Sequence, residues 1–571
     1  MTQKQTAFIP TRDIAKKWWK SAVVYQVYPA SFYDTNGDGV GDLKGVIAKL
    51  DYLKDLGVDA IWINPMFKSP QGDMDIHEAY GTVADVDTLI AELHKRDMKL
   101  VLDLVPNHTS EEHPWFLESK SSKTNPKRNW YFWRPPKYDA DGNRKEPNNW
   151  ESVFGGPAWK WDESTQEYYL HIFDQCQPDL NWDEPEVREE MYSMMRWWID
   201  KGADGYRIDV IGRISKNQEL PDAPVTNPDK PYQEIRRADG PRLHEFLKEM
   251  DREVMSKYDK DIMSVGELNQ VEPDHMLKFT HPDNHEISMG FTFDHCNIGI
   301  IGTGMWRHVV GPYKLSELKK TFSKWQGVRD MGAWHALYLE NHDQPRSISR
   351  WTSDKPEFRW DSGRLLAMLE CTQFGTVYIY QGQEIGMINI PDDWPLEEWK
   401  DVQTGNIVRE FRERGEDVEQ WTKKVYAKAR DNARNPVQWN SEANGGFSTG
   451  TPWMRVSPDY LECNVEAQVN DPNSLFSFWK TLLALRKEHE DVLIYGSYRE
   501  LTPEDERVFA YLREEKFLVV MNFTEETVEY ELPEKYATSK LVVGTQDSFP
   551  ATLGATVTLP AFAGVIYEVV Q

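Results

Sequence analysis

Gly205-Tyr206-Arg207-Ile208-Asp209-Val210-Ile211 is an apolar, strand-like run with an acidic residue near its end. Ser264-Val265-Gly266-Glu267 and Glu340-Asn341-His342-Asp343 repeat this arrangement farther along the chain. A (β/α)8 barrel gathers such residues at the carboxyl ends of its strands, where catalysis takes place in that fold. Two carboxyl groups around a glycosidic bond, one as nucleophile and one as acid, suffice for hydrolysis with retention. The three runs therefore predict a barrel enzyme that acts on carbohydrates.

Short apolar runs alternate with amphipathic stretches over the first three-quarters of the chain, which is typical of an α/β fold. Apolar residues at helical spacing predict helices at 43–56 and near 86–97. Eight strand-like runs give the number that a barrel needs, at 23–28, 60–66, 99–105, 205–211, 263–268, 288–294, 334–340 and 375–381.

Two segments interrupt this alternation and a third follows it. Residues 109–183 are rich in Trp, Pro, Asn and Gly and predict a small domain inserted after the third strand. A charged segment at about 386–455 predicts a second insertion after the eighth strand. The barrel would then comprise 1–108 and 184–495. Apolar runs separated by turns predict a C-terminal antiparallel β-sandwich at 496–571, with strands at 517–523, 540–545 and 565–570.

The chain is strongly acidic, with 66 Lys and Arg against 93 Asp and Glu and a net charge of −27. This charge argues against nucleic acid or an anionic membrane as a partner. The N-terminus has no apolar core typical of a secretory signal, and no uncharged apolar run is long enough to span a bilayer. Four scattered cysteines show no metal-ligand spacing and fit reduced thiols in a cytoplasmic protein: Cys176, Cys296, Cys371 and Cys463. We also expect a monomer.

Seven motifs occur in a fixed order along the chain: DLVPNH (103–108), QPDLNW (177–182), GYRIDV (205–210), VGEL (265–268), ENHDQPRS (340–347), YQGQEIG (380–386) and DNARNPVQW (431–439). On these motifs the chain resembles, nearly from end to end, the family 13 glycoside hydrolases (the α-amylase family). Within that family it is similar to the oligo-1,6-glucosidase, maltase and isomaltase branch.

The resemblance implies roles for three carboxylates. Asp209 matches the nucleophile that forms a covalent glycosyl-enzyme. Glu267 matches the general acid/base, whose pKa should be raised by burial or by Asp209. Asp343 matches the third carboxylate, which binds sugar hydroxyls and favours the distorted transition state. Arg207, two residues before the nucleophile on the same strand face, would keep Asp209 ionised.

The resemblance also implies a set of substrate-binding residues. His108 and His342 match the histidines that bind hydroxyls of the terminal glucose, and Arg434 matches the arginine that clamps it and closes the pocket. Asp73 can take the place of the family aspartate that binds the same sugar. Asp103, at the start of its motif, is expected to support the site from below.

The loop at 34–42 places hard oxygen ligands at alternate positions, as calcium requires. Gly45 stands where an EF-hand has its bidentate Glu, which excludes an EF-hand. The loop instead resembles the short calcium loop of the family. That resemblance predicts a structural Ca²⁺ held by the side chains of Asp34, Asn36, Asp38 and Asp42 and the carbonyl of Val40, with a solvated Asn/Gly turn as the alternative.

The chain departs from the family pattern after the second strand. A deletion of roughly eight residues between Met74 and Asp75 accounts for the shorter sequence, and Ile76 stands where the branch has a Tyr under the glucose ring. An aromatic platform of this kind contributes about 1 kcal/mol or more. We therefore expect a chain that folds and keeps its catalytic carboxylates but binds glucose weakly.

The prediction is a retaining, exo-acting α-glucosidase for short α-gluco-oligosaccharides. Val210, the residue after the nucleophile, resembles that of enzymes acting on α-1,6 bonds, whereas Thr, Ala or Gly there goes with α-1,4 specificity. An α-1,4 maltase or a transglucosidase on the same scaffold is the first alternative. A non-catalytic sugar-binding relative, like the amylase-like heavy chains of amino-acid transporters, is the second, favoured only by the shortened 73–76 loop. The RLDRD-type loop of sucrose isomerases is absent before Trp334.

Overall fold

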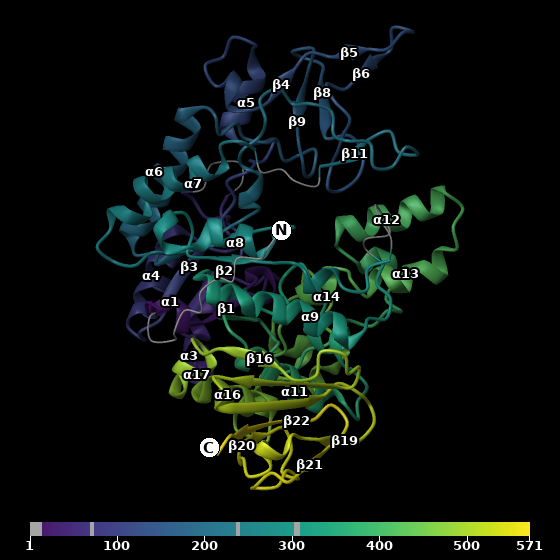
Figure 1. Cartoon of the computed structure of the whole chain (residues 1–571). Coiled ribbons are helices and arrows are strands. Elements are labelled where there is room, and N and C mark those ends of the chain that lie inside the picture. Colours follow the sequence, from purple (N-terminus) through teal and green to yellow (C-terminus); the bar gives the residue numbers. More distant parts are fainter. Residues whose placement is uncertain (1–13, 69–73, 236–239, 302–308, 571) are drawn as a thin grey trace, which may run out of the picture.

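Eight parallel strands form the centre of the protein in a computed structural model that describes residues 14–68, 74–235, 240–301 and 309–570 (Figure 1). Their order is β13-β12-β10-β3-β2-β1-β15-β14, and a parallel bridge between Gly290 and His335 joins the two ends. All eight predicted strands and the (β/α)8 barrel are thereby confirmed. The strands are β1 (Val23–Val27), β2 (Ala60–Ile63), β3 (Lys99–Leu104), β10 (Gly205–Ile208), β12 (Met263–Glu267), β13 (Met289–Phe291), β14 (Ala336–Leu337) and β15 (Thr376–Tyr380).

Helices surround the barrel and bury their apolar faces against it. The longer ones are α4 (Val83–His94), α6 (Pro185–Lys201), α7 (Leu243–Glu253), α8 (Pro273–Thr280), α9 (Leu315–Gln326), α11 (Arg359–Thr372) and α16 (Leu475–Glu488). Short helices lie among them: α1 (Trp18–Ser21), α10 (Ser347–Trp351), α15 (Val465–Val469) and α17 (Glu490–Leu493). No helix of the described ranges combines the length and apolarity that a membrane crossing requires.

Two helix predictions need correction. The helix expected near 86–97 begins earlier, because Thr82 and Asp85 form a capping box that starts α4 at Val83. The prediction of a single helix at 43–56 is wrong. The segment forms two helices, α2 (Leu43–Ala48) and α3 (Leu50–Leu56). They are separated at Lys49, whose φ of −107° and ψ of 8° are not helical. The Lys49 ammonium lies 4.1 Å from the ring centres of both Tyr33 and Trp439, a pair of cation–π contacts that accompanies the break.

A small, mostly antiparallel region separates β3 from β10 and lies at the top of Figure 1. It contains α5 (Pro114–Ser121), a three-stranded sheet and a hairpin: β4 (Trp133–Arg134), β9 (Glu167–Leu170), β8 (Trp159–Asp162), β5 (Lys137–Tyr138) and β6 (Arg144–Lys145). Its strand β7 (Trp150–Glu151) pairs with β11 (Gln233–Glu234), which comes after β10 in the chain. Leu220, Ala223 and Ile235 join its apolar cluster. The expected boundary at 183 therefore omits a segment, about 217–235, that packs on this region.

Two further regions follow β15. Helices α12 (Val402–Glu413) and α13 (Val418–Tyr426) form a hairpin that faces the β11 region across a gap in Figure 1, and the short α14 (Asp431–Arg434) follows. Beyond residue 496 two antiparallel sheets, β16-β17-β18-β22-β20 and β19-β21, enclose their own apolar cluster. These strands are β16 (Tyr498–Glu500), β17 (Val508–Arg513), β18 (Phe517–Asn522), β19 (Val528–Glu531), β20 (Lys540–Gly544), β21 (Thr556–Leu559) and β22 (Gly564–Glu568). They confirm the predicted C-terminal β domain.

Candidate active site

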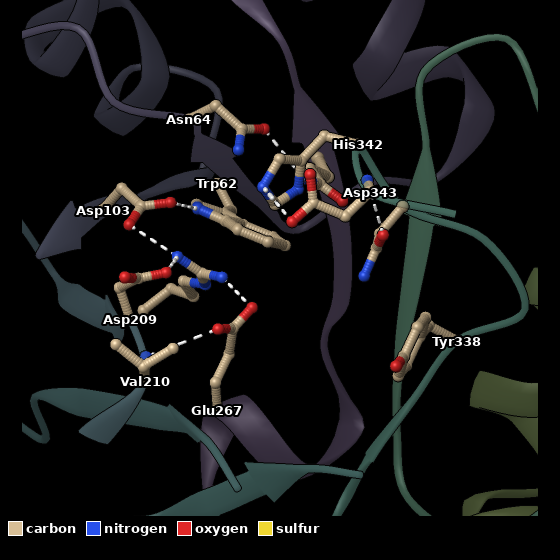
Figure 2. A network of polar contacts seen from close by, with 12 residues as sticks. Trp62, Asn64, Asp103, Asp209, Val210, Glu267, Tyr338, His342 and Asp343 are labelled. Carbon is tan, nitrogen blue, oxygen red and sulfur yellow. Dashed lines mark hydrogen bonds and ion pairs between the residues drawn. The ribbon is translucent and has the colours of Figure 1, made fainter. Parts of the chain in front are cut away.

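Arg207 holds three carboxylates together at the carboxyl ends of the barrel strands. Its Nη1 lies 2.8 Å from Asp103 Oδ1 and 2.9 Å from Asp209 Oδ1, and its Nη2 contacts Glu267 Oε1. The Arg207 side chain is 1 % exposed, so its ends of these charge-assisted bonds are shielded from solvent. Figure 2 shows the three acidic side chains gathered on one side of the site. Arg207 and Asp209 face the same way because side chains two apart share a strand face.

Asp103 is the most deeply buried of the three carboxylates, with a side chain that is 0 % exposed. Trp62 Nε1 donates to Asp103 Oδ2 at 3.0 Å, and the Arg207 guanidinium carbon lies 5.0 Å from the centre of the Trp62 ring. Burial raises the pKa of Asp103 to about 7, with Arg207 opposing the shift and Asp209 adding to it. Asp103 therefore acts as a buried support for Arg207.

Glu267 has the raised pKa that a general acid requires. Burial is the largest cause and Arg207 opposes it, while Asp209 and Asp343 add negative charge; together they raise the pKa of Glu267 to about 8. Such a carboxyl is mostly protonated at neutral pH. It can donate a proton while a neighbouring carboxylate remains ionised.

Asp343 differs from Glu267 in that positively charged groups surround its carboxylate. Its Oδ1 accepts from Arg434 Nη2 at 2.8 Å and lies 3.4 Å from Arg430 Nε. Burial alone would raise the pKa of Asp343, but Arg430, His342 and Arg434 hold it well below its usual range. Asp343 is therefore a permanent carboxylate at neutral pH.

His342 lies beside Asp343, with its Nε2 3.6 Å from Asp343 Oδ2 (Figure 2). Its Nδ1 lies 2.7 Å from Gln26 Nε2, and that amide also donates to Asn64 Oδ1 at 2.8 Å. Burial lowers the pKa of His342 to about 4, against the pull of Asp343. The imidazole is neutral near pH 7 and, with its Nδ1 accepting from Gln26, presents a donor at Nε2.

His108 is buried in the loop that follows β3, and its ring centre lies 5.3 Å from that of Phe173. Burial lowers the pKa of His108, against the influence of Asp209. The structure thus brings Asp209, Glu267, Asp343 and their expected partners His108, Arg207, His342 and Arg434 to one end of the barrel. Asp73, also expected here, lies outside the described residues.

A cavity of about 250 Å³ adjoins Asp343. It falls below the range of about 300–1,000 Å³ typical of drug-sized ligands, so it suits a small polar molecule. Sequence reasoning named only three of its lining residues and missed the rest. It is lined by Tyr28, Pro29, Asn64, Pro65, Tyr80, His342, Asp343, Arg430 and Arg434.

Of the residues that were missed, Arg430 could have been found from its spacing in the sequence. Arg430 stands four residues before Arg434, which is one helical turn, so both guanidinium groups can reach one carboxylate. Tyr28 and Tyr80 give the cavity two aromatic walls and had no such signal. Ile76, in the shortened loop, is 3 % exposed and bridges Phe67, so it belongs to the core.

Val210 adopts an unusual backbone conformation beside the carboxylates. Its φ of 36° and ψ of 41° lie in the left-handed region, which is a true outlier for a β-branched residue. Its N–H lies 3.4 Å from Glu267 Oε2. Backbone strain of this kind persists at functional sites, where surrounding structure holds it.

A much larger cleft, of about 950 Å³, lies between the β7–β11 region and α12. Phe293 and Gln344, from the barrel, are among the residues that line it. Phe154, Tyr232 and Gln403 also line it, with many charged side chains.

The 34–42 loop has the oxygen-rich donor set that fits calcium. Its acidic side chains accept backbone hydrogen bonds: Asp34 from Asn36, Gly37 and Gly39 at 2.8–3.0 Å, and Asp42 from Gly45 at 2.7 Å. Within the described ranges, no three His, Cys, Asp or Glu side chains cluster in a metal-binding arrangement. The calcium ion therefore stays a prediction, carried by the donor chemistry alone.

The fold and the paired carboxylates define a glycoside hydrolase. Residues 26–496 match the model of the α-amylase catalytic domain, and residues 498–566 match that of the maltogenic amylase C-terminal domain. The chain belongs to the α-amylase family, glycoside hydrolase family 13.

Individual relatives narrow the comparison. An oligo-1,6-glucosidase of Parageobacillus thermoglucosidasius is 49 % identical, over 93 % of this chain and 95 % of its own. An α-glucosidase of Schizosaccharomyces pombe is 43 % identical, over 98 % of this chain and 99 % of its own. A mutant isomaltulose synthase of Erwinia rhapontici, solved with D-glucose, superposes with a TM-score of 0.92 at 39 % identity, covering 98 % of this chain and 100 % of its own.

Proposed function

We propose that this chain is a retaining, exo-acting α-glucosidase that removes terminal glucose from short α-gluco-oligosaccharides, with α-1,6 (isomaltose-type) linkages favoured. The observation that carries the proposal is the single Arg207 guanidinium that contacts both Asp209 and Glu267. Because one guanidinium touches both carboxyl groups, we infer the closer of the two spacings that distinguish retaining from inverting enzymes. Carboxyl groups about 5–5.5 Å apart act by double displacement, whereas inverting enzymes hold them about 6.5–9.5 Å apart around a water.

The reaction would proceed in two steps. In the first, Glu267 protonates the glycosidic oxygen while Asp209 attacks the anomeric carbon, so that the leaving sugar departs with the proton and a covalent glycosyl-Asp209 forms. In the second, the Glu267 carboxylate takes a proton from water. The resulting hydroxide attacks the anomeric carbon and releases Asp209.

The small cavity supports action at chain ends. Asp343, Arg434 and His342 line it and supply charged and neutral hydrogen-bonding groups for the hydroxyls of one glucose. Tyr28 and Tyr80 supply aromatic surface. The wider cleft beside α12 would hold the leaving part of the substrate.

The linkage preference rests on Val210, and Val210→Thr tests it. Thr is also β-branched and keeps the size and backbone preference of Val, so the change isolates the side-chain chemistry. We expect the ratio of kcat/KM for isomaltose over maltose to fall about 10-fold, the scale of discrimination in a small apolar pocket. Measuring kcat/KM for both disaccharides checks this, and an unchanged ratio would remove Val210 as the determinant.

An α-1,4 maltase, a transglucosidase and a catalytically impaired sugar-binding relative are the alternatives. The kcat/KM values for isomaltose and maltose test the α-1,4 maltase alternative. A transglucosidase would yield longer sugars at high substrate concentration. The third draws support only from the shortened loop before Ile76.

Restoring the shortened loop tests how far it weakens glucose binding. Insertion of GYDISDYR after Met74 is expected to lower KM for an aryl α-glucoside about 5- to 10-fold, because an aromatic platform contributes about 1 kcal/mol or more. Insertion of GADISDYR is the matched control that restores length without the ring. If the two insertions perform alike, or neither improves activity, the hypothesis of a lost platform fails.

The predicted calcium ion should stabilise the fold without taking part in catalysis. Removing it with EDTA is expected to lower the thermal unfolding midpoint by several degrees. Saturation at 100 times Kd contributes about 2.7 kcal/mol, and added Ca²⁺ should restore the midpoint. In Asp38→Ala the midpoint should no longer respond to EDTA. A wild-type midpoint that ignores EDTA would exclude the site.

A further inference from the structure

A buried lysine, Lys216, ends a chain of polar contacts that leads to His108. Its Nζ lies 2.7 Å from Asn107 Oδ1 and 2.8 Å from Asp179 Oδ2. Lys216 is 4 % exposed, and Asn107 and Asp179 are fully buried. The catalytic steps use none of these three residues, so their burial as polar groups calls for another explanation.

Two partners fix the orientation of the Asn107 amide. An ammonium group can only donate, so the atom that Asn107 turns toward Lys216 is its oxygen. An ionised carboxylate can only accept, and Asp179 Oδ2 lies 3.1 Å from Asn107 Nδ2. Both contacts demand the same orientation, with the amide nitrogen turned away from the lysine.

The Asn107 amide in turn fixes the proton on His108. Asn107 Nδ2 lies 3.2 Å from His108 Nδ1, so it donates there and the ring nitrogen must accept. A neutral imidazole has one N–H, which then resides on Nε2. Burial lowers the pKa of His108, which keeps the ring neutral.

A second amide competes for the other ring nitrogen. Gln177 Nε2 lies 3.0 Å from His108 Nε2, while Gln177 Oε1 accepts from the Asp174 N–H at 3.1 Å. A neutral ring cannot accept at both nitrogens. Asn107 is held by two charged groups, whose hydrogen bonds are about twice as strong as neutral ones. Gln177 is held by only one neutral hydrogen bond, so its contact with His108 is the weaker one. Either the Gln177 amide turns its oxygen toward the ring, or a ligand oxygen replaces Gln177 as the partner of His108 Nε2.

We propose that Lys216 is a positioning residue that acts through Asn107 to fix His108 as the Nε2–H tautomer, so that the ring presents a hydrogen-bond donor to a sugar hydroxyl. The identity of that ligand rests on the proposed function. The tautomer itself does not, because it follows from the protein contacts alone.

The ¹⁵N chemical shifts of the His108 ring test the proposal directly, since protonated and unprotonated ring nitrogens resonate far apart. The full chain would be labelled with ¹⁵N-histidine, and the His108→Gln spectrum would assign the signals. We expect a protonated Nε2 and an unprotonated Nδ1 in the wild type. A protonated Nδ1 would overturn the proposal, whatever the enzyme's activity.

Two variants separate positioning from simple structural support. Asn107→Asp replaces the amide donor by an acceptor, so Nδ1 should become protonated; retention of an unprotonated Nδ1 would contradict the account. Lys216→Met removes one of the two contacts that orient the Asn107 amide and leaves only that with Asp179. It should give a mixture of tautomers, whereas an unchanged spectrum would contradict the account. Should Lys216→Met fail to fold, the wild-type and Asn107→Asp spectra still decide.

Kinetics supply a second readout. Loss of one donor to the sugar should raise KM for an aryl α-glucoside about 3- to 10-fold in Lys216→Met, the effect of one hydrogen bond, and Lys216→Arg should recover part of it. Lys201→Met is the control, because Lys201 pairs with Asp87 on the surface at 2.9 Å. If the control raises KM as much as Lys216→Met does, the contacts from Lys216 through Asn107 to His108 have no specific effect on substrate binding.

Discussion

Replacing Asp209 by alanine is expected to lower kcat/KM for any α-glucoside by roughly 10⁴-fold or more, because the group that forms the covalent bond is removed. Arg207 would keep its contacts with Asp103 and Glu267, so the variant should fold. Circular dichroism and thermal unfolding beside the steady-state assay check both expectations. A variant that keeps activity within tenfold of the wild type would remove Asp209 as the nucleophile.

Azide makes this test more specific. In Asp209→Ala a small anion can occupy the space of the lost carboxylate and attack the anomeric carbon from that face. The expected product is the β-glucosyl azide, with inverted configuration. The α-azide would place the missing nucleophile on the wrong face and contradict the assignment.

Replacing Glu267 by glutamine is expected to lower kcat about 10²–10⁴-fold for isomaltose, the usual contribution of general acid–base catalysis. The loss in the first step should be much smaller for an aryl glucoside with an acidic phenol, because that leaving group departs without protonation. Comparing the two substrates by single-turnover kinetics separates the acid role from a general disruption of the site. Equal losses on both substrates would contradict the acid role.

The pH profile follows from the same residue. The acid is active when protonated, and the pKa of Glu267 is about 8, so wild-type kcat/KM should fall as pH rises through about 8. Asp343, whose pKa lies well below its usual range, stays ionised throughout and adds no limb there. Glu267→Gln should lose the limb near pH 8, whereas any limb from Asp103, whose pKa is about 7, stays in both enzymes. A wild-type alkaline limb that persists in Glu267→Gln would belong to another group.

The barrel was predictable because its strands are continuous apolar runs, which is the sequence pattern of parallel strands buried on both faces. The positions of Arg207 and Asp209 followed from the strand period, and their meeting with Glu267 followed from the fold. The resemblance to the family supplied roles that spacing alone could not. Family membership is confirmed, whereas the roles stay predictions until the variants are measured.

Other features depend on contacts between segments distant in sequence. The segment at 217–235 packs on the region before β10, with Trp150 Nε1 donating to the Pro221 carbonyl at 2.8 Å, and no local pattern marks that contact. Lys216 reads as an ordinary polar loop residue until Asn107 and Asp179 are placed around it. The break at Lys49 likewise accompanies contacts with two aromatic rings, one of them about 390 residues away.

The anomeric form of the glucose first released tests the central claim most directly. Proton NMR during the first minutes of hydrolysis of an aryl α-glucoside distinguishes the two anomers before they interconvert. Double displacement through Asp209 predicts that α-glucose appears first and the β-anomer only later, by mutarotation. Initial release of β-glucose would show a single displacement by water and would contradict a covalent intermediate on Asp209.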